Sequence, residues 1–268
     1  MPEQMRGVII SHTPLGEEYR ELTVRARGMP PAEPGQFAGL KVSKTRDPLL
    51  RRPLSIYDQG PGDGMLRFLY RLAGKGTRLL ADFREGEDVD LIAPLGRGFS
   101  LEGLTPKSRA LLVAGGVGAA PLYFLARKLQ EKKVPITFIL GGQRAADLSF
   151  RGKIAAALGE GLAITTEDGS LGRRGLVTGP LRDLLGEKQG FNSLHIFACG
   201  PGPMLREVAR LAREMGEFPL QVSLEAVMAC GFGACLGCVC PADGEEGSEA
   251  YRRVCKEGPV FFAGEVEL

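Results

Sequence analysis

Residues 110–127, ALLVAGGVGAAPLYFLAR, join an apolar run to a glycine-rich turn and then to a helical stretch. The run predicts a buried strand, and Pro121 suits the first helical turn, where N–H groups lack partners within the helix. Gly115, Gly116 and Gly118 permit a tight turn that would bring the backbone close to a pyrophosphate at the helix N-terminus. Because the spacing differs from G-x-G-x-x-G, a strand-to-helix connection without a ligand is the alternative.

The rest of residues 101–219 repeats this alternation. ITFILGG, LAITTEDG and LHIFACG indicate further buried strands, and GPMLREVARLAREMG indicates a helix. The alternation predicts an α/β domain with a doubly wound parallel sheet, in which ligands bind at the carboxyl ends of the strands. Cys199, Gly200 and Pro201 end the last of these strands, so we expect them at a nucleotide site. Cys199 could equally be a buried thiol at the end of a strand.

The choice between the two nicotinamide dinucleotides is open from the sequence. Glu167 and Asp168 follow a predicted strand and could accept hydrogen bonds from ribose hydroxyls, which favours NAD(H). Arg173 and Arg174, with Arg144, could instead bind a 2′-phosphate. We favour NAD(H) and keep NADP(H) as the alternative.

Residues 1–100 show short alternating strands broken by Gly and Pro, which predict a small antiparallel barrel. In RRPLSIYD, the guanidinium of Arg52 could bind a pyrophosphate, and the hydroxyl of Ser55 could hydrogen-bond a heteroaromatic ring. Gly76 and Thr77 open a short helix whose free N–H groups suit phosphate. The alternatives are surface charge and a plain helix cap.

Residues 220–268 contain a cysteine-rich run, AVMACGFGACLGCVCP, in which the spacing C-x4-C-x2-C is followed after sixteen residues by another cysteine. This is the plant-type [2Fe–2S] spacing. The four cysteines in this register are Cys230, Cys235, Cys238 and Cys255. Cys240 is surplus. Zinc usually takes two C-x2-C pairs, and disulfides are exposed to reduction in a cytoplasmic protein, so both alternatives are weaker.

Composition limits the possible classes of protein. A net charge of +2 gives no reason to expect binding to nucleic acid or to an anionic membrane. The longest uncharged stretch, residues 110–126, is short for a membrane span and contains three glycines and a proline, so we expect no membrane segment. The first residues show no apolar signal core, which predicts a cytoplasmic protein.

Taken together, these features resemble the ferredoxin-reductase superfamily and, within it, the family of electron-transfer subunits of NAD-linked dihydroorotate dehydrogenases. The resemblance runs from end to end and rests on RRPLSIYD, FLYRLAGKGT, VAGGVGAAPL, FACGPGPML, SLEAVMACGFGACLGCVC and RVCKEGPVFFAGEV. The last two are the most specific, because they contain the cysteines and fix the order of the three regions. Many relatives carry Tyr where this chain has Leu54, so the resemblance leaves the packing at the flavin face open.

The resemblance implies three domains: an FAD-binding barrel in residues 1–100, an NAD-binding parallel-sheet domain in residues 101–219 and a [2Fe–2S] domain in residues 220–268. It implies FAD bound by Arg52, Pro53, Leu54, Ser55, Leu69, Tyr70, Arg71, Gly76 and Thr77. It implies NAD(H), as co-substrate, near Gly115, Gly116, Gly118, Cys199, Gly200 and Pro201. It implies a [2Fe–2S] cluster on Cys230, Cys235, Cys238 and Cys255.

The resemblance also implies a partner, an FMN-containing catalytic subunit that oxidises dihydroorotate to orotate for pyrimidine (UMP) biosynthesis, in a heterotetramer with two copies of each chain. Electrons would pass through the cluster and FAD to NAD⁺, and no side-chain acid or base would be required in this chain. One alternative is the same module serving a glutamate-synthase-like or bifurcating NAD(P)H–ferredoxin oxidoreductase. A second is a non-enzymatic redox sensor or scaffold.

Overall fold

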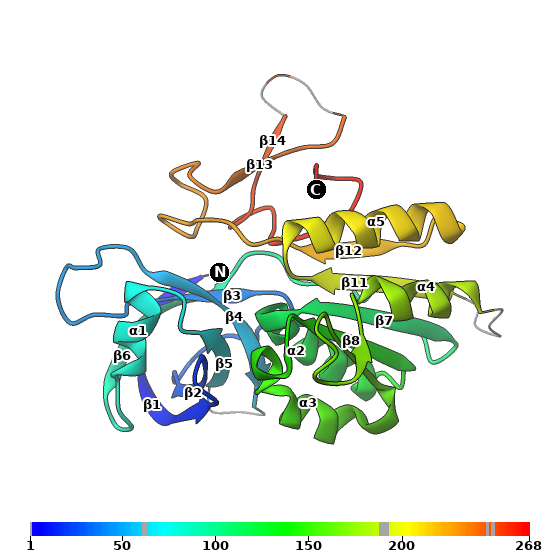
Figure 1. The fold of residues 1–268 in the computed structure, drawn as a ribbon. Helices are drawn as coiled ribbons and strands as arrows, with labels where there is room; N and C mark the ends of the chain where they lie inside the picture. The colour runs from blue at the N-terminus through cyan, green and yellow to red at the C-terminus, as the bar shows by residue number, and fades with distance from the viewer. Residues whose placement is uncertain (1, 61–63, 188–192, 245–246, 248–249) are drawn as a thin grey trace.

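The computed structural model describes residues 2–60, 64–187, 193–244, 247 and 250–268. Figure 1 shows a barrel beside a larger sheet with helices on its faces, and a small hairpin from the C-terminal region above both. The predicted fold class, an antiparallel barrel followed by a doubly wound α/β domain and a small C-terminal region, is confirmed.

The N-terminal sheet closes on itself, so its strands have no free edge. Apolar side chains such as those of Leu22, Ile56 and Phe68 fill its interior and are fully buried. The barrel strands, in pairing order, are β1 (Glu3–Leu15), β2 (Tyr19–Arg25), β5 (Met65–Arg71), β4 (Arg52–Gln59), β3 (Phe37–Leu40) and β6 (Asp88–Leu95). The predicted short helix after GKGT is α1 (Lys75–Ala81).

The second sheet winds outward from its first strand in chain order, with its second, third and fourth strands added on one side and its fifth, sixth and seventh on the other. The winding reverses between β7 and β11, and open sheets of this kind bind ligands at that point. In sheet order the strands are β10 (Arg173–Arg174), β9 (Leu162–Thr166), β8 (Ile136–Gly142), β7 (Ser108–Gly115), β11 (Ser193–Cys199), β12 (Leu220–Ser223) and β15 (Val260–Phe262). All but β15 run parallel.

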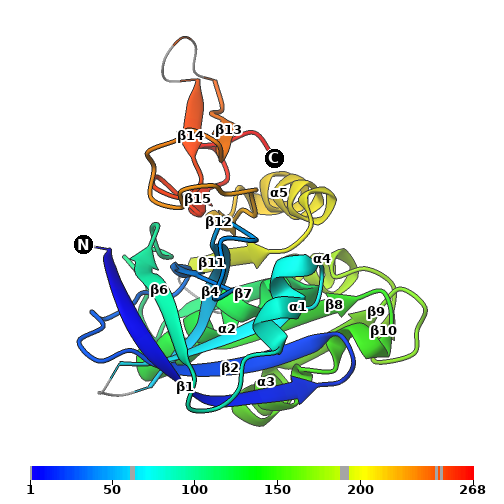
Figure 2. The ribbon, with the colours of Figure 1, turned by 90° about the vertical axis from the view of Figure 1, so that its left-hand side faces the viewer.

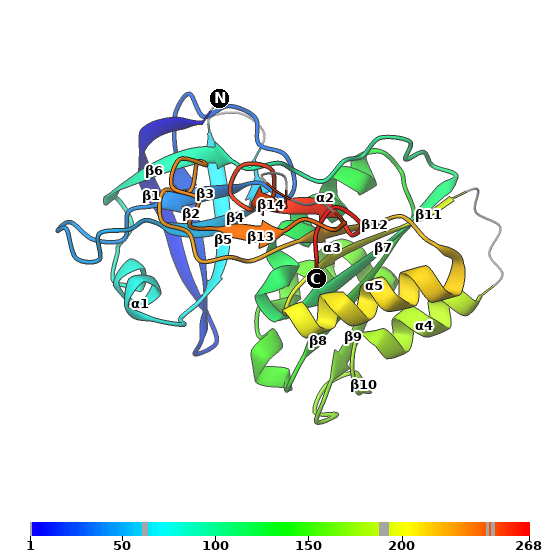
Figure 3. The same cartoon turned by 90° about the horizontal axis from the view of Figure 1, so that it is seen from above.

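Helices cover both faces of this sheet. Apolar residues of α2 and α3 share one buried cluster with one face of the strands, and those of α4 and α5 share another with the opposite face. Figure 3 shows α4 and α5 side by side. The helices are α2 (Ala119–Glu131), α3 (Arg151–Leu158), α4 (Thr178–Gly186) and α5 (Gly202–Gly216), with short 3₁₀ turns at Gly116–Gly118, Ala145–Leu148 and Gly159–Gly161. Over the described residues, none of the helices is long and apolar enough to cross a lipid bilayer.

The C-terminal region is tied to both larger parts. Its hairpin, β13 (Val239–Pro241) and β14 (Tyr251–Arg253), stands clear of the main sheet in Figure 2. The last strand, β15, pairs antiparallel with β12, and the buried cluster beneath includes barrel residues Phe37 and Leu95. β12 lies just beyond residue 219 yet belongs to the main sheet, and the boundaries of the three domains remain predictions.

Candidate functional site

A cavity of about 650 Å³ opens at the carboxyl ends of the parallel strands, beside the barrel. The turns that follow β7 and β11 form part of its wall and contribute Gly115, Gly116, Gly200 and Pro201. These two strands flank the point where the winding reverses. Four of the six residues expected near NAD(H) therefore line one cavity, and Gly118 and Cys199 lie behind its wall.

The glycines at this cavity are required by the contact between its two turns. A Cβ atom on Gly118 would lie 2.3 Å from the carbonyl oxygen of Cys199, and one on Gly115 would lie 2.8 Å from Cδ of Pro201. Gly200 has φ +156° and packs on Gly115, where an added Cβ would lie 3.0 Å from the Gly115 Cα. The glycines therefore let the two turns touch and leave their backbone exposed to the cavity.

The thiol of Cys199 is buried beneath this wall. Burial raises its pKa to about 12, although a hydrogen bond from the Ser223 hydroxyl acts in the opposite direction. The group is therefore a neutral thiol at pH 7. Cys199 therefore fits the expected strand-end position through its backbone, and its sulfur behaves as a small core group.

Residues outside the two glycine turns complete the cavity. Tyr19 and Arg71 come from the barrel side, whereas Asp147, Glu207 and Glu225 come from three separate segments of the α/β region. The sequence predicted only Arg71 of these, as part of the flavin strand. Glu225 stands within the SLEAVMACGFGACLGCVC run but was given no role there. The other three belong to no short motif, because their common feature is a position at the carboxyl end of the sheet.

The two acidic residues that follow β9, Glu167 and Asp168, have different surroundings. Glu167 lines the cavity. Asp168 does not: its Oδ1 accepts hydrogen bonds from the Ser170 N–H at 2.9 Å and from the Ser170 hydroxyl at 2.6 Å, which lower its pKa. Of the two carboxylates, Glu167 is therefore the one at the cavity.

Two of the three arginines that could have favoured a 2′-phosphate form ion pairs within the protein. Arg173 pairs with Asp183 of α4 at 2.5 Å. Arg144 lies 3.5 Å from Asp147 and 3.8 Å from Glu18. These pairs, with Glu167 in the cavity, favour NAD(H) over NADP(H).

On the barrel, the structure brings Arg52 of β4 against the start of α1. A Cβ atom on Gly76 would lie 2.2 Å from Arg52 Nε, so a larger residue at this position would displace the guanidinium from the helix start. Arg52 Nη1 also donates to the Leu50 carbonyl at 2.7 Å. Thr77 Oγ1 accepts the N–H groups of Ala73 and Gly74, at 3.0 and 3.1 Å, and so holds the turn before the helix. Two motifs more than twenty residues apart in sequence therefore form one surface.

The remaining residues expected at the flavin lie on the neighbouring strands β4 and β5. Pro53, Leu54 and Ser55 are half-buried on β4. Leu69 is buried on β5, and Arg71 at the end of that strand pairs with Glu18 at 2.6 Å.

Tyr70 has its side chain inside the barrel. Its hydroxyl lies 2.8 Å from His12 Nε2, and His12 Nδ1 lies 2.9 Å from the Phe83 carbonyl. If Nδ1 donates to that carbonyl, the Tyr70 hydroxyl donates to Nε2. Only the backbone of Tyr70 is then available to a ligand outside the barrel.

The four cysteines of the C-terminal region lie as two pairs. Cys230 and Cys235 are hydrogen-bonded through their side chains, and so are Cys238 and Cys255. Within the described part of the chain, no three His, Cys, Asp or Glu side chains are gathered closely enough to hold one metal ion. The arrangement is therefore two adjacent thiol pairs and not a single closed four-ligand site.

Backbone N–H groups point at these sulfurs. Ala234 donates to Cys230 Sγ at 3.3 Å, Gly237 to Cys235 Sγ at 3.4 Å, and the Cys255 N–H to Cys238 Sγ at 3.4 Å. At Cys230, burial favours the neutral thiol, but N–H groups of the loop outweigh it and lower the pKa to about 6. Such donors stabilise thiolates and the sulfur atoms of a cluster.

Two family models match the chain. The "Iron-sulfur cluster binding domain of dihydroorotate dehydrogenase B" matches residues 225–267, which contain the two thiol pairs. The "Oxidoreductase NAD-binding domain" matches residues 112–210, which contain both glycine turns of the cavity.

Relatives extend this match to the whole chain. The dihydroorotate dehydrogenase B (NAD(+)) electron transfer subunits of Geobacillus kaustophilus (strain HTA426) and Bacillus caldolyticus are each 43% identical to it over 264 residues, which is 98% of this chain and 98% of each relative. A solved structure of an NADH-dependent reduced ferredoxin-NADP oxidoreductase is 29% identical, with a TM-score of 0.80 over 97% of this chain and 89% of its own. The chain belongs to the family of dihydroorotate dehydrogenase B (NAD(+)) electron transfer subunits, as the sequence motifs indicated.

Proposed function

We propose that this chain carries electrons from the FMN of a catalytic partner subunit to NAD⁺, using FAD on the barrel and a [2Fe–2S] cluster on Cys230, Cys235, Cys238 and Cys255. When bound, FAD exchanges a hydride with nicotinamide and single electrons with the cluster, and so joins two-electron to one-electron chemistry. The protein's part is to hold these groups close together and in order.

The observation that carries the proposal is the contact between the cysteine loop and the flavin side of the barrel. A Cβ atom on Gly231, next to Cys230, would lie 3.8 Å from the Leu95 side chain at the end of β6. Leu95 is opposite Phe37 in β3, and Phe37 is opposite Ser55 in β4. Since neighbouring strands are about 4.8 Å apart, Ser55 lies on the order of 10 Å along the sheet from Leu95, beside which the loop passes. This arrangement supports neighbouring cluster and flavin sites.

For FAD, we propose that the guanidinium of Arg52 neutralises the pyrophosphate beside Gly76 and Thr77. The close contact between Arg52 and Gly76 supports a single surface for the phosphates. Residues 53–55 and 69–71 would line the ring system, chiefly through the backbone at Tyr70. Ser55 would hydrogen-bond the flavin.

For the cluster, the two thiol pairs suit two irons, each held by two protein sulfurs. The loop between Cys230 and Cys235 is held by Arg253, whose Nη1 donates to the Gly233 carbonyl at 2.9 Å. The spare cysteine, Cys240, lies on β13 opposite Arg252, outside both pairs.

Exposed apolar side chains around the loop support a partner at this face. Within ten residues of this loop, Val227 is 88% exposed, Phe232 50% and Leu236 61%, and Cys235 is also exposed. Exposed apolar side chains gathered on one region mark protein interaction sites. We propose that the FMN-bearing subunit covers this face, in an assembly of two copies of each chain, and that the pair works in the reducing cytoplasm.

Co-purification tests this proposal. The chain, produced with the other proteins of its cell, is expected to bring down an FMN-containing subunit that oxidises dihydroorotate, and the pair is expected to reduce NAD⁺ with dihydroorotate. The isolated chain should oxidise NADH with an artificial acceptor but leave dihydroorotate unchanged. Recovery of a different partner, without dihydroorotate oxidation, would favour the bifurcating-oxidoreductase alternative. Absence of NADH turnover would favour the redox-sensor alternative.

A further inference from the structure

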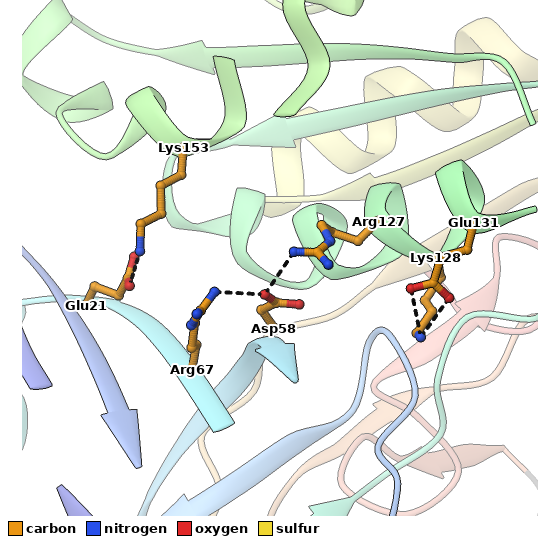
Figure 4. Close-up of polar contacts among 7 residues, drawn as sticks. All are labelled: Glu21, Asp58, Arg67, Arg127, Lys128, Glu131 and Lys153. Carbon is orange, nitrogen blue, oxygen red and sulfur yellow. Dashed lines mark hydrogen bonds and ion pairs between the residues drawn. The ribbon is translucent and has the colours of Figure 1, made fainter. Parts of the chain in front are cut away.

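The barrel and the α/β part meet along strand β4 and helix α2 (Figure 4). Tyr57 of β4 stacks on Tyr123 of α2, with ring centroids 4.5 Å apart and planes 22° apart. Burial raises the pKa of Tyr57, as does the neighbouring Tyr123, so this hydroxyl stays neutral. The aromatic contact joins two elements from different parts of the fold.

Beside the two tyrosines lies a buried carboxylate with two cations. The Asp58 side chain is only 4% exposed, and its Oδ2 lies 3.1 Å from Arg67 Nη1 and 3.4 Å from Arg127 Nη1. Arg67 belongs to β5 and Arg127 to α2, so the carboxylate bridges the barrel and the helix. The negative charge of Asp58 raises the pKa of Arg127, and this effect outweighs partial burial, which lowers it. A carboxylate this deeply buried is costly unless cations pair with it. Arrangements of α2 that keep Arg127 beside Asp58 are therefore favoured over others.

Both joined elements carry a proposed cofactor site at one end. β4 begins at Arg52, the proposed FAD ligand, and reaches Asp58 within the same strand. α2 follows directly on the Gly116–Gly118 turn beside the nucleotide cavity and reaches Arg127 two turns later. A displacement of α2 along β4 would change the position of the nicotinamide site relative to the flavin site.

We propose that Asp58 and Arg127 are positioning residues for hydride transfer: their ion pair across the two parts fixes the nicotinamide site relative to the flavin. This inference rests on the proposed FAD and NAD(H) sites. In the reaction, NADH gives a hydride, with both electrons, to FAD, which also takes a proton from water, yielding NAD⁺ and reduced FAD. The transfer rate depends on the separation and angle of the two rings, and a shift of 1 Å can cost about 10²-fold.

A second bridge keeps the two parts together when the first is altered. Lys153 of α3 forms an ion pair with the buried carboxylate of Glu21 on β2, also seen in Figure 4. Ser149 donates its hydroxyl to the Leu15 carbonyl at 2.5 Å. In Arg127→Met, moreover, Asp58 keeps Arg67. This variant is therefore expected to fold and to lose only the fine placement of α2.

The chain offers a matched control one residue along the helix. Lys128 pairs with Glu131 of the same helix at 2.9 Å, and Figure 4 shows this pair away from the Asp58 bridge. Lys128 Nζ also lies 6.0 Å from the centroid of the Phe124 ring in the same helix. Lys128→Met therefore makes the same change, from a cation to methionine, and removes ionic contacts within α2 only.

The experiment compares Arg127→Met and Lys128→Met in the full, FAD-containing chain by stopped-flow reduction with NADH. We expect the limiting rate of flavin reduction to fall roughly tenfold or more in Arg127→Met, with FAD content and the NADH dissociation constant unchanged. Lys128→Met should match wild type. Amide hydrogen exchange, which needs no turnover, should quicken in α2 and β4 of Arg127→Met alone.

An unchanged rate in Arg127→Met, or equal falls in both variants, would overturn the positioning role. Unchanged exchange in α2 and β4 would also overturn it. If the wild-type chain holds no FAD, or its flavin is not reduced by NADH, the proposed function fails instead. The exchange measurement would then still decide whether Arg127 holds the two parts together.

Discussion

Cys235→Ser is expected to remove the [2Fe–2S] absorption and electron paramagnetic resonance signals from the purified chain, while the flavin absorption remains. Cys235 is one of the proposed Cys230 and Cys235 pair, and its sulfur accepts the Gly237 N–H. Iron in such clusters is held by soft thiolates, and a serine hydroxyl replaces one poorly. One iron would lose half of its protein ligands, so the loss of the cluster should be nearly complete.

Cys240→Ser is the control for that variant. Cys240 lies five residues further on, also carries a thiol, and faces Arg252 across the β13–β14 hairpin. We expect its cluster spectrum to match wild type. Equal loss in the two variants would show that the C-x4-C-x2-C register is wrong.

Arg52→Ala is expected to weaken FAD binding by about 1.5–3 kcal/mol, the usual size of a hydrogen bond to a charged group. This corresponds to a dissociation constant roughly 10- to 150-fold higher. The expectation follows from the position of the guanidinium over Gly76, where the phosphates are proposed to lie. Titration of the flavin-stripped variant with FAD, followed by fluorescence, measures the change.

Arg51→Ala is the neighbouring control. Arg51 forms an ion pair with Asp90 at 2.9 Å and donates to the Asp90 carbonyl, so its contacts lie within the barrel. Its loss should lower the free energy of unfolding by about 1 kcal/mol without changing FAD affinity. If Arg52→Ala binds FAD as tightly as Arg51→Ala does, the proposed phosphate contact is wrong.

The two main sheets could be predicted because their signals are local. Alternating strands with Gly and Pro between them give the barrel, and the run from Ala110 to Arg127 gives the start of a doubly wound sheet. The place of β15 could not be predicted in the same way. Three residues, Val260–Phe262, carry too little pattern, and their pairing with β12 depends on the tertiary fold.

Prediction of the site was limited in the same way, because some of its features depend on the tertiary fold. The motifs placed Gly115 and Gly200 correctly at one cavity, because the carboxyl ends of parallel strands share one edge. They did not separate Glu167 from Asp168, since only the turn made by Ser170 decides which carboxylate faces the cavity. The Asp58–Arg127 bridge joins residues 69 positions apart, and no spacing rule connects them.

The most direct test of the account is the composition of the chain purified without oxygen: iron, acid-labile sulfide, zinc and flavin, measured with the visible spectrum. The account predicts about two irons, two sulfides and one FAD per chain, with bleaching of both flavin and cluster bands on addition of NADH. Zinc in place of iron, or no metal at the cysteines, would contradict it, because FAD would then have no one-electron acceptor within this chain.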